Sequence, residues 1–208
     1  MDEIASNRHA WGTLAEDHYR HYKERIERGE NRLNIHIREE LGDLAGKRVA
    51  HLQCNVGFDT LALAESAARV TGVDLAPENV RCAQRLAEDF GIGNVEFVEA
   101  DVCDLPASLN GRFDVAFTSE GVLGWLPDLD AWARGVRRLL VDGGFLYVFD
   151  SHRSTWPSTR ISWGAASTTW RTPTSARSPT WKTASAATPR SRRRASRRTS
   201  GCTPSRIS

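Results

Sequence analysis

The stretch Arg48-Val49-Ala50-His51-Leu52-Gln53-Cys54-Asn55-Val56-Gly57 decides the fold of this chain. Its first half is a short apolar run typical of a buried strand, and Gly57 opens a helical stretch that continues to about Ala68. A strand, a tight glycine-containing turn and a helix form one β-loop-α unit. We therefore expect a fold built from a series of such units.

The same alternation continues to residue 150. It predicts strands over 69–74, 95–99, 113–119 and 145–150, and helices over 77–90 and 129–140. Pro77 suits the first turn of its helix, and Asp142-Gly143-Gly144 is predicted to end the helix before the last strand. The pattern predicts an α/β, Rossmann-like, doubly wound fold with a mostly parallel sheet. Such sheets bind ligands at the carboxyl ends of their strands.

Two helices are predicted ahead of this series, over 12–28 and 31–42, because apolar residues recur there at helical spacing. We divide the chain into N-terminal helices (1–45), a core (46–150) and a tail (151–208).

Composition excludes several protein classes. The chain has no apolar run near the 18 or so residues that a membrane span needs, and its N-terminus is charged where a secretory signal is apolar. We expect a cytoplasmic protein that does not enter a membrane. The cysteines are scattered and form no CxxC pair, so we expect reduced thiols and no metal site; they are Cys54, Cys82, Cys103 and Cys202.

The loop that ends at Gly57 is the first candidate binding element. A glycine between a strand and a helix permits close backbone approach, and the free N–H groups of the helix start suit a carboxylate or phosphate. Of the three glycines in a G-x-G-x-G loop only Gly57 is present, because Gln53 and Asn55 occupy the other two places. This motif alone is equally consistent with a ligand-binding glycine and with a glycine that serves only packing.

Asp74 ends the second predicted strand, 17 residues after Gly57. A carboxylate there is placed to accept hydrogen bonds from both hydroxyls of an adenosine ribose, and the same position in a nicotinamide enzyme would do the same. The alternative is that Asp74 caps the helix that begins at Pro77.

Asp101 and Val102 follow the third predicted strand. Their position suits an acid that accepts from an adenine amino group and an apolar side chain that packs on the ring. A surface-loop carboxylate is the alternative for Asp101 taken singly. The spacing favours a site, because Gly57, Asp74 and Asp101 fall in three successive strand-loop units.

Residues 48 to about 150 resemble a class I S-adenosylmethionine-dependent methyltransferase of the type that acts on small molecules. The resemblance lies in Val49–Gly57, Val70–Asp74, Glu99–Val102, Phe113–Ser119 and the stretch from Asp128 to Phe145. It implies S-adenosylmethionine as cofactor, a small-molecule methyl acceptor, and residues 1–45 as a cap on the acceptor side. His51 and Gln53 stand where the family usually has Asp and Gly. The implied cofactor-binding residues are His51, Gln53, Cys54, Asn55, Gly57, Asp74, Leu75, Asp101 and Val102, with Ser119 and Gly121 lining the methyl-transfer side.

Methyl transfer from a sulfonium needs little covalent help, because the donor is already activated and the leaving group is neutral. Alignment of the acceptor supplies much of the rate. Glu120 and His18 are the polar side chains that we single out for acceptor contact or proton removal. The alternative for each is a structural role.

The amino-acid composition changes abruptly after Asp150. Residues 151–208 contain 13 Ser, 11 Thr, 11 Arg and 4 Trp, but no Leu, Val, Phe, Met, Tyr, Asp or Glu. A disordered basic arm is one interpretation. The other is a reading-frame change near His152, because a one-base shift converts Ser (TCN) and Trp (TGG) codons into codons with T in the middle, which encode apolar residues. A class I enzyme without its native C-terminus would lack the sixth and seventh strands, and we expect it to be less stable and less active.

Two other functions stay open at this point. One is a nicotinamide-dinucleotide-binding oxidoreductase, against which stands the absence of a G-x-G-x-x-G motif. The other is a nucleic-acid-binding protein that uses the basic run Arg190–Arg198, which would bind phosphates by charge alone. We expect no nucleic-acid partner, and the sequence leaves the oligomeric state open.

Overall fold

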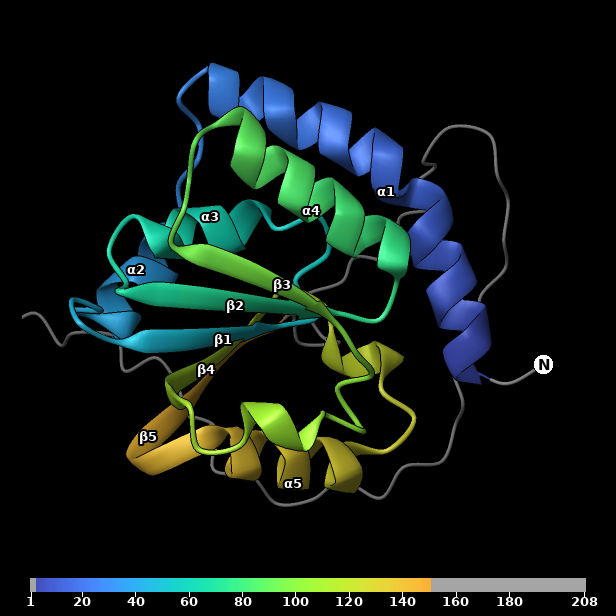
Figure 1. Cartoon of the computed structure of the whole chain (residues 1–208), viewed down its shortest axis with the longest axis vertical. Coiled ribbons are helices and arrows are strands. Elements are labelled where there is room, and N and C mark those ends of the chain that lie inside the picture. Colours follow the sequence, from blue (N-terminus) through green and yellow to red (C-terminus); the bar gives the residue numbers. More distant parts are fainter. Residues whose placement is uncertain (1–2, 151–208) are drawn as a thin grey trace, which may run out of the picture. The chain divides into compact units, whose positions relative to one another are not determined.

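A computed structural model of the chain describes residues 3–150. Within them a five-stranded sheet has the order β3-β2-β1-β4-β5, and every strand pair is parallel (Figure 1). The strand order reverses between β1 and β4, which makes the carboxyl ends of these two strands the expected ligand site. The strands are β1 (Arg48–Leu52), β2 (Arg69–Asp74), β3 (Val95–Glu99), β4 (Phe113–Ser119) and β5 (Leu140–Phe149).

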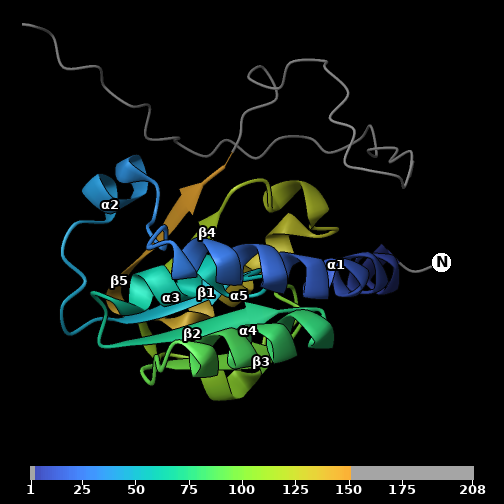
Figure 2. The same ribbon diagram turned by 90° about the horizontal axis from the view of Figure 1, so that it is seen from above.

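Helices cover both faces of this sheet, as expected for a doubly wound fold. Figure 1 shows α3 and α4 on one side of the strands and α5 on the other. Helix α1 packs against α4 and runs beside it in Figure 1 and Figure 2. The helices are α1 (Glu3–Glu27), α2 (Ile35–Leu41), α3 (Phe58–Ala64), α4 (Pro77–Asp89) and α5 (Leu129–Leu139), with short 3-10 helices at Ala107–Leu109 and Leu123–Trp125.

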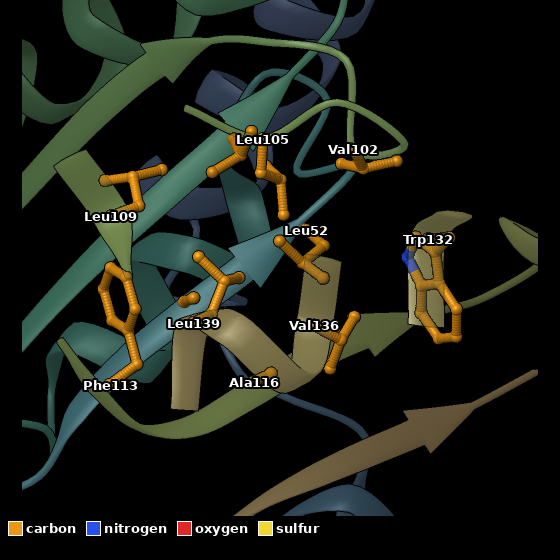
Figure 3. Packing of buried hydrophobic residues seen from close by; sticks show 11 residues of the cluster. Leu52, Val102, Leu105, Leu109, Phe113, Ala116, Trp132, Val136 and Leu139 are labelled. Carbon is orange, nitrogen blue, oxygen red and sulfur yellow. The ribbon is translucent and has the colours of Figure 1, made fainter. Parts of the chain in front are cut away.

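Alternate residues of β1 enter opposite cores. Ala50 and Leu52 pack in the cluster beneath α5, where Trp132 also lies (Figure 3). Val49 packs in the other core, with residues of α2 and α3. Burial on both faces explains why β1 reads as a continuous apolar run rather than an alternating one.

The first two helices differ in extent from the prediction. Helix α1 begins at Glu3 rather than at residue 12, and its first turns are held by tertiary contacts of Asn7 and Trp11 with Trp125. Helix α2 begins at Ile35 rather than at residue 31, because the Asn34 side chain accepts from the His36 N–H and caps the helix. Helix α3 ends at Ala64, four residues earlier than expected.

The prediction that Asp142-Gly143-Gly144 ends a helix is wrong. Helix α5 ends at Leu139, and Leu140 already pairs with Phe113 of β4. The glycines lie at a register shift inside β5, where Gly143 has a φ of 82° and a Cβ on Gly144 would lie 3.1 Å from a β4 carbonyl oxygen. A bulge and a helix stop require the same residue type, so the local sequence does not separate them.

β5 forms one edge of the sheet in the described part of the chain. Its side chains Phe145, Leu146 and Val148 are 40%, 37% and 38% exposed. The predictions for residues 151–208, including the disordered tail, the reading-frame change and the basic run, lie outside the described residues. No helix in residues 3–150 is both long and apolar enough to cross a membrane. Over the same range no cluster of three His, Cys, Asp or Glu side chains is arranged to hold a metal ion.

Candidate functional site

The loop between β1 and α3, residues 53–57, has an alternating left-handed backbone. Gln53, Asn55 and Gly57 have φ values of 56°, 52° and 81°. These are the three positions at which a G-x-G-x-G loop has glycine. Asparagine adopts this conformation more readily than most residues, whereas glutamine adopts it at a cost. The loop therefore keeps the glycine-type conformation although two of its glycines are replaced.

Asp74, at the end of β2, holds this loop in place. One carboxylate oxygen accepts from the Asn55 N–H at 2.7 Å, and the other accepts from the Ala76 N–H and the Asn79 amide, both at 3.0 Å. Burial raises the pKa of Asp74, and these hydrogen bonds oppose the rise. The N-cap of α4 is Ala76, so Asp74 is not the helix cap of the alternative interpretation.

Gln53 joins the β1 loop to the segment after β4. Its Nε2 donates to the Val122 carbonyl oxygen at 3.0 Å, across the point where the strand order reverses. Its Oε1 is buried and accepts no hydrogen bond from residues 3–150. A buried amide oxygen without a donor is costly unless a ligand supplies one.

Gly57 and Cys54 lie where the loop packs against β2 and β3. A Cβ on Gly57 would be 2.9 Å from the Phe97 ring and 3.1 Å from the Ala83 Cβ. Cys54 is buried, its N–H donates to the Val73 carbonyl oxygen at 2.9 Å, and burial raises the pKa of its thiol. The glycine is thus required by packing as well as by backbone conformation.

His51 lies in the core on the α3 side of β1. It is 2% exposed, its Nδ1 is 2.8 Å from the Thr60 hydroxyl, and its ring packs edge-on against Phe117. Burial lowers the pKa of His51 to about 3, so the imidazole is neutral. Its contacts lie within the core rather than with the other predicted site residues.

A carboxylate that the sequence analysis missed lies beside the loop. Asp59, in the first turn of α3, accepts from the Ser119 hydroxyl at 3.0 Å. Burial raises the pKa of Asp59, the Ser119 hydrogen bond opposes this, and the negative charge of Glu120 adds to the rise. An acid two residues after Gly57 was the available sequence signal. Asp59 therefore places a carboxyl group in the first turn of α3, where an anion site was predicted, and the positive charge of Arg25 acts on the same carboxyl.

The segment after β4 carries Glu120 and Gly121. Glu120 has a φ of 46° and its N–H donates to the Phe149 carbonyl oxygen at 2.7 Å. The Gly121 N–H donates to the carboxylate of Asp150, also at 2.7 Å. Asp150 was not predicted as a site residue. Its carboxylate holds the segment after β4, which Gln53 contacts through the Val122 carbonyl oxygen.

Asp101 and Val102, the residues predicted to contact adenine, follow β3, which lies two strands from β1 in the sheet. Asp101 accepts from the Cys103 N–H at 2.8 Å, which forms a local turn. Val102 is buried in the core beneath α5, near Trp132 (Figure 3). Leu75, directly after Asp74, is half-buried. In the described structure, Asp101 and Val102 make no hydrogen bond with residues 53–57.

Helix α1 brings His18 to the β1 loop. The His18 Nδ1 is 3.0 Å from the Asn55 Oδ1, and the rings of Trp11 and Tyr22 lie 6.2 Å from the His18 ring. Within residues 3–150 His18 makes no hydrogen bond with Glu120. The two residues predicted to be catalytic lie on different elements, His18 on α1 and Glu120 directly after β4.

A parallel sheet with a reversal between β1 and β4, a left-handed loop after β1 and an acid at the end of β2 define a class of α/β proteins that bind nucleoside-containing cofactors. Residues 49–144 match the family described as methyltransferase domain. The solved complex of DhpI with SAH has a TM-score of 0.55 and 26% identity, covering 71% of this chain and 68% of that one.

Two relatives extend the comparison. A ubiquinone biosynthesis O-methyltransferase of Xanthomonas oryzae pv. oryzae (strain PXO99A) is 37% identical over 112 residues, which are 54% of this chain and 46% of that protein. An uncharacterized methyltransferase of Synechocystis sp. is 31% identical over 145 residues, 67% of this chain and 66% of that protein. The chain spans about half the length of the first of these relatives. Residues 49–144 therefore form a methyltransferase domain of the class I S-adenosylmethionine-dependent type.

Proposed function

We propose that this chain transfers a methyl group from S-adenosylmethionine to a hydroxyl group of a small molecule. The observation that carries the proposal is the β1 loop, whose left-handed positions are held by Asp74 on one side and by Val122 on the other. The relative named as an O-methyltransferase supports oxygen as the methylated atom.

The residues present fit this cofactor in charge and in hydrogen bonding. The orphan Oε1 of Gln53 is an acceptor suited to an ammonium group. Asp59 lies two residues after the β1 loop and is subject to the negative charge of Glu120 and the positive charge of Arg25, so the site offers an anionic group to an ammonium and a cationic group to a carboxylate. S-adenosylmethionine carries an ammonium, a sulfonium and a carboxylate, and when bound it supplies an activated methyl group.

The charge of the site opposes the dinucleotide alternative. The pyrophosphate of a nicotinamide cofactor normally lies at the start of the helix after β1. In this chain the Asp59 carboxylate occupies that first turn. The expected cost of placing two negative groups there is the reason for preferring methyl transfer.

We assign acceptor contact and proton removal to His18 and Glu120. His18 lies beside the β1 loop, held by Asn55, and Glu120 lies directly after β4. Positioning of the acceptor oxygen would supply much of the acceleration, and removal of its proton would add to it. The proposed residues for the adenosine part are Asp74, Leu75, Asp101 and Val102.

Calorimetric titration of the full chain with S-adenosylhomocysteine tests the cofactor assignment. We expect stoichiometric binding, whereas NAD should give no heat above the dilution blank. Binding of NAD without binding of S-adenosylhomocysteine would reject the proposal. Transfer of isotope-labelled methyl from S-adenosylmethionine to catechol, a simple aromatic hydroxyl compound, is the matching activity assay.

We also propose a cytoplasmic location and no nucleic-acid partner. Cys54, Cys82 and Cys103 are free thiols, which suits a reducing compartment. Cell fractionation followed by immunoblotting tests the location.

A further inference from the structure

We infer that Asn55 is a positioning residue that fixes the tautomer of His18, so that the Nε2 of His18 is the base that takes the proton of an acceptor hydroxyl. The inference rests on the proposed methyl transfer and extends it to a residue of the β1 loop. It gives a role to a position at which a G-x-G-x-G loop has glycine.

The hydrogen bonds of Asn55 determine which of its side-chain atoms faces His18. The Val56 N–H donates to Asn55 Oδ1 at 2.7 Å. The reversed amide orientation would set an NH₂ group against that N–H, so the oxygen orientation is the favoured one. The same oxygen lies 3.0 Å from the Nδ1 of His18.

An amide oxygen only accepts hydrogen bonds, so Nδ1 of His18 carries the proton. In the neutral imidazole Nε2 then holds a lone pair. Within residues 3–150 Nε2 makes no hydrogen bond, so the lone pair is not used by the described protein. Trp11 and Tyr22 flank the ring and restrict its rotation.

Asn55 combines a left-handed backbone conformation with a side-chain acceptor for His18. Its φ of 52° is a conformation that glycine and asparagine adopt most readily. Its N–H bonds to Asp74 at 2.7 Å, so the residue that orients His18 is itself anchored to the end of β2. Glycine would meet the backbone demand but would leave Nδ1 without an acceptor.

The acceptor oxygen forms a bond to the methyl carbon while the sulfur–carbon bond breaks and its electron pair stays on sulfur. The hydroxyl proton goes to Nε2 of His18, which becomes an imidazolium stabilised by the Asn55 carbonyl at Nδ1. Solvent then takes the proton. The acceptor class is therefore a molecule with a weakly acidic hydroxyl group.

Long-range ¹H–¹⁵N NMR of the full chain at a pH about two units above the ordinary histidine pKa of about 6.5 reads the tautomer directly. A His18→Gln variant assigns the signal. We expect the Nδ1–H form in the wild type, a shift toward the Nε2–H form in Asn55→Gly, and retention of the Nδ1–H form in Asn55→Asp, which keeps an acceptor oxygen. Asn34→Gly is the matched control, because it removes an asparagine that caps α2 and should leave the His18 signal unchanged.

An Nε2–H form in the wild type, or no change in Asn55→Gly, overturns the role of Asn55. Diethyl pyrocarbonate, which acylates unprotonated imidazole nitrogen, tests the role of Nε2. We expect modification of His18 that S-adenosylhomocysteine slows, and modification without protection would place Nε2 outside the site. Failure of S-adenosylhomocysteine to bind would instead reject the proposed function, whatever the tautomer.

Discussion

The backbone N–H of Asn55 donates to a carboxylate oxygen of Asp74 over 2.7 Å, and this bond ties the β1 loop to the end of β2. The other Asp74 oxygen holds Ala76 and Asn79 at the start of α4. One side chain therefore fixes two of the segments expected to surround the cofactor.

Asp74→Asn should loosen this junction. Asparagine keeps one acceptor oxygen and sets an NH₂ group against a backbone N–H, so we expect a loss of about 1–3 kcal/mol in the free energy of unfolding. Affinity for S-adenosylhomocysteine should fall as well, measured by calorimetry. Asp114→Asn is the control, because Asp114 accepts from the Arg48 N–H at 2.8 Å at the other end of the strands. Equal loss of cofactor affinity in both variants would contradict the assignment.

The buried His51 should make the free energy of unfolding depend on pH. Its pKa is about 3 in the folded chain, whereas an unfolded histidine titrates near 6.5. Unfolding therefore takes up a proton between these values, and the free energy of unfolding should fall as the pH falls through this window, by up to about 1.4 kcal/mol per pH unit. Chemical denaturation at several pH values measures the slope.

His51→Asn should flatten that slope, although loss of the ring also lowers stability at neutral pH. His36→Asn, at an exposed position of α2, should leave the slope unchanged. A wild-type slope unaltered by His51→Asn would show that other groups cause the acid sensitivity.

Gly57→Ala separates backbone strain from packing. The left-handed backbone should cost about 1–2 kcal/mol, and contact with Phe97 and Ala83 should add about 1–3 kcal/mol. Gly111→Ala is a matched control, because Gly111 has a φ of 62° with no atom within 4 Å of the added Cβ. Denaturant unfolding should show the larger loss for Gly57→Ala, and equal losses would mean that Phe97 moves aside freely.

Local patterns predicted the sheet, because each strand and its following helix are close in sequence. The unit from Arg48 to Ala64 was recognisable from an apolar run, a glycine and helical spacing. The acid at Asp74 followed from the same reasoning one strand later. The fold class and the position of Asp74 at the end of a strand therefore needed no knowledge of distant contacts.

The contacts that define the site join residues far apart in sequence, and these were not predicted. Gln53 and Val122 are 69 residues apart, Asp59 and Ser119 are 60 apart, and His18 and Asn55 are 37 apart. Side-chain identity gives no signal of such pairing before the sheet assembles. The prediction that Gly143 and Gly144 end a helix was wrong for another reason. A β-bulge and a helix end both require glycine, so the local sequence does not distinguish them.

Asp59 should help this site distinguish S-adenosylmethionine from S-adenosylhomocysteine. Only the former carries a sulfonium charge, so Asp59→Asn should weaken its binding by about fivefold more than that of the latter, about 1 kcal/mol of charge interaction at partly screened distance. Competition titrations measure both affinities. Asp130→Asn removes the same charge from the first turn of α5 and should leave the ratio unchanged. A ratio that Asp59→Asn does not alter would place the sulfonium away from Asp59.

The exposed edge strand β5 should make the chain self-associate. Phe145, Leu146 and Val148 present apolar side chains on a strand with one unpaired edge in the described structure, and such edges pair with other chains. Leu146→Lys adds a charge there and should reduce the associated fraction in sedimentation experiments.

Leu14→Lys is the control for that substitution. Leu14 is 43% exposed, close to the 37% of Leu146, but it lies on α1, away from the sheet edge. The two variants therefore add the same charge at similar exposure and differ in their distance from the unpaired backbone. If Leu14→Lys reduced association as strongly, net charge rather than the β5 edge would be the cause.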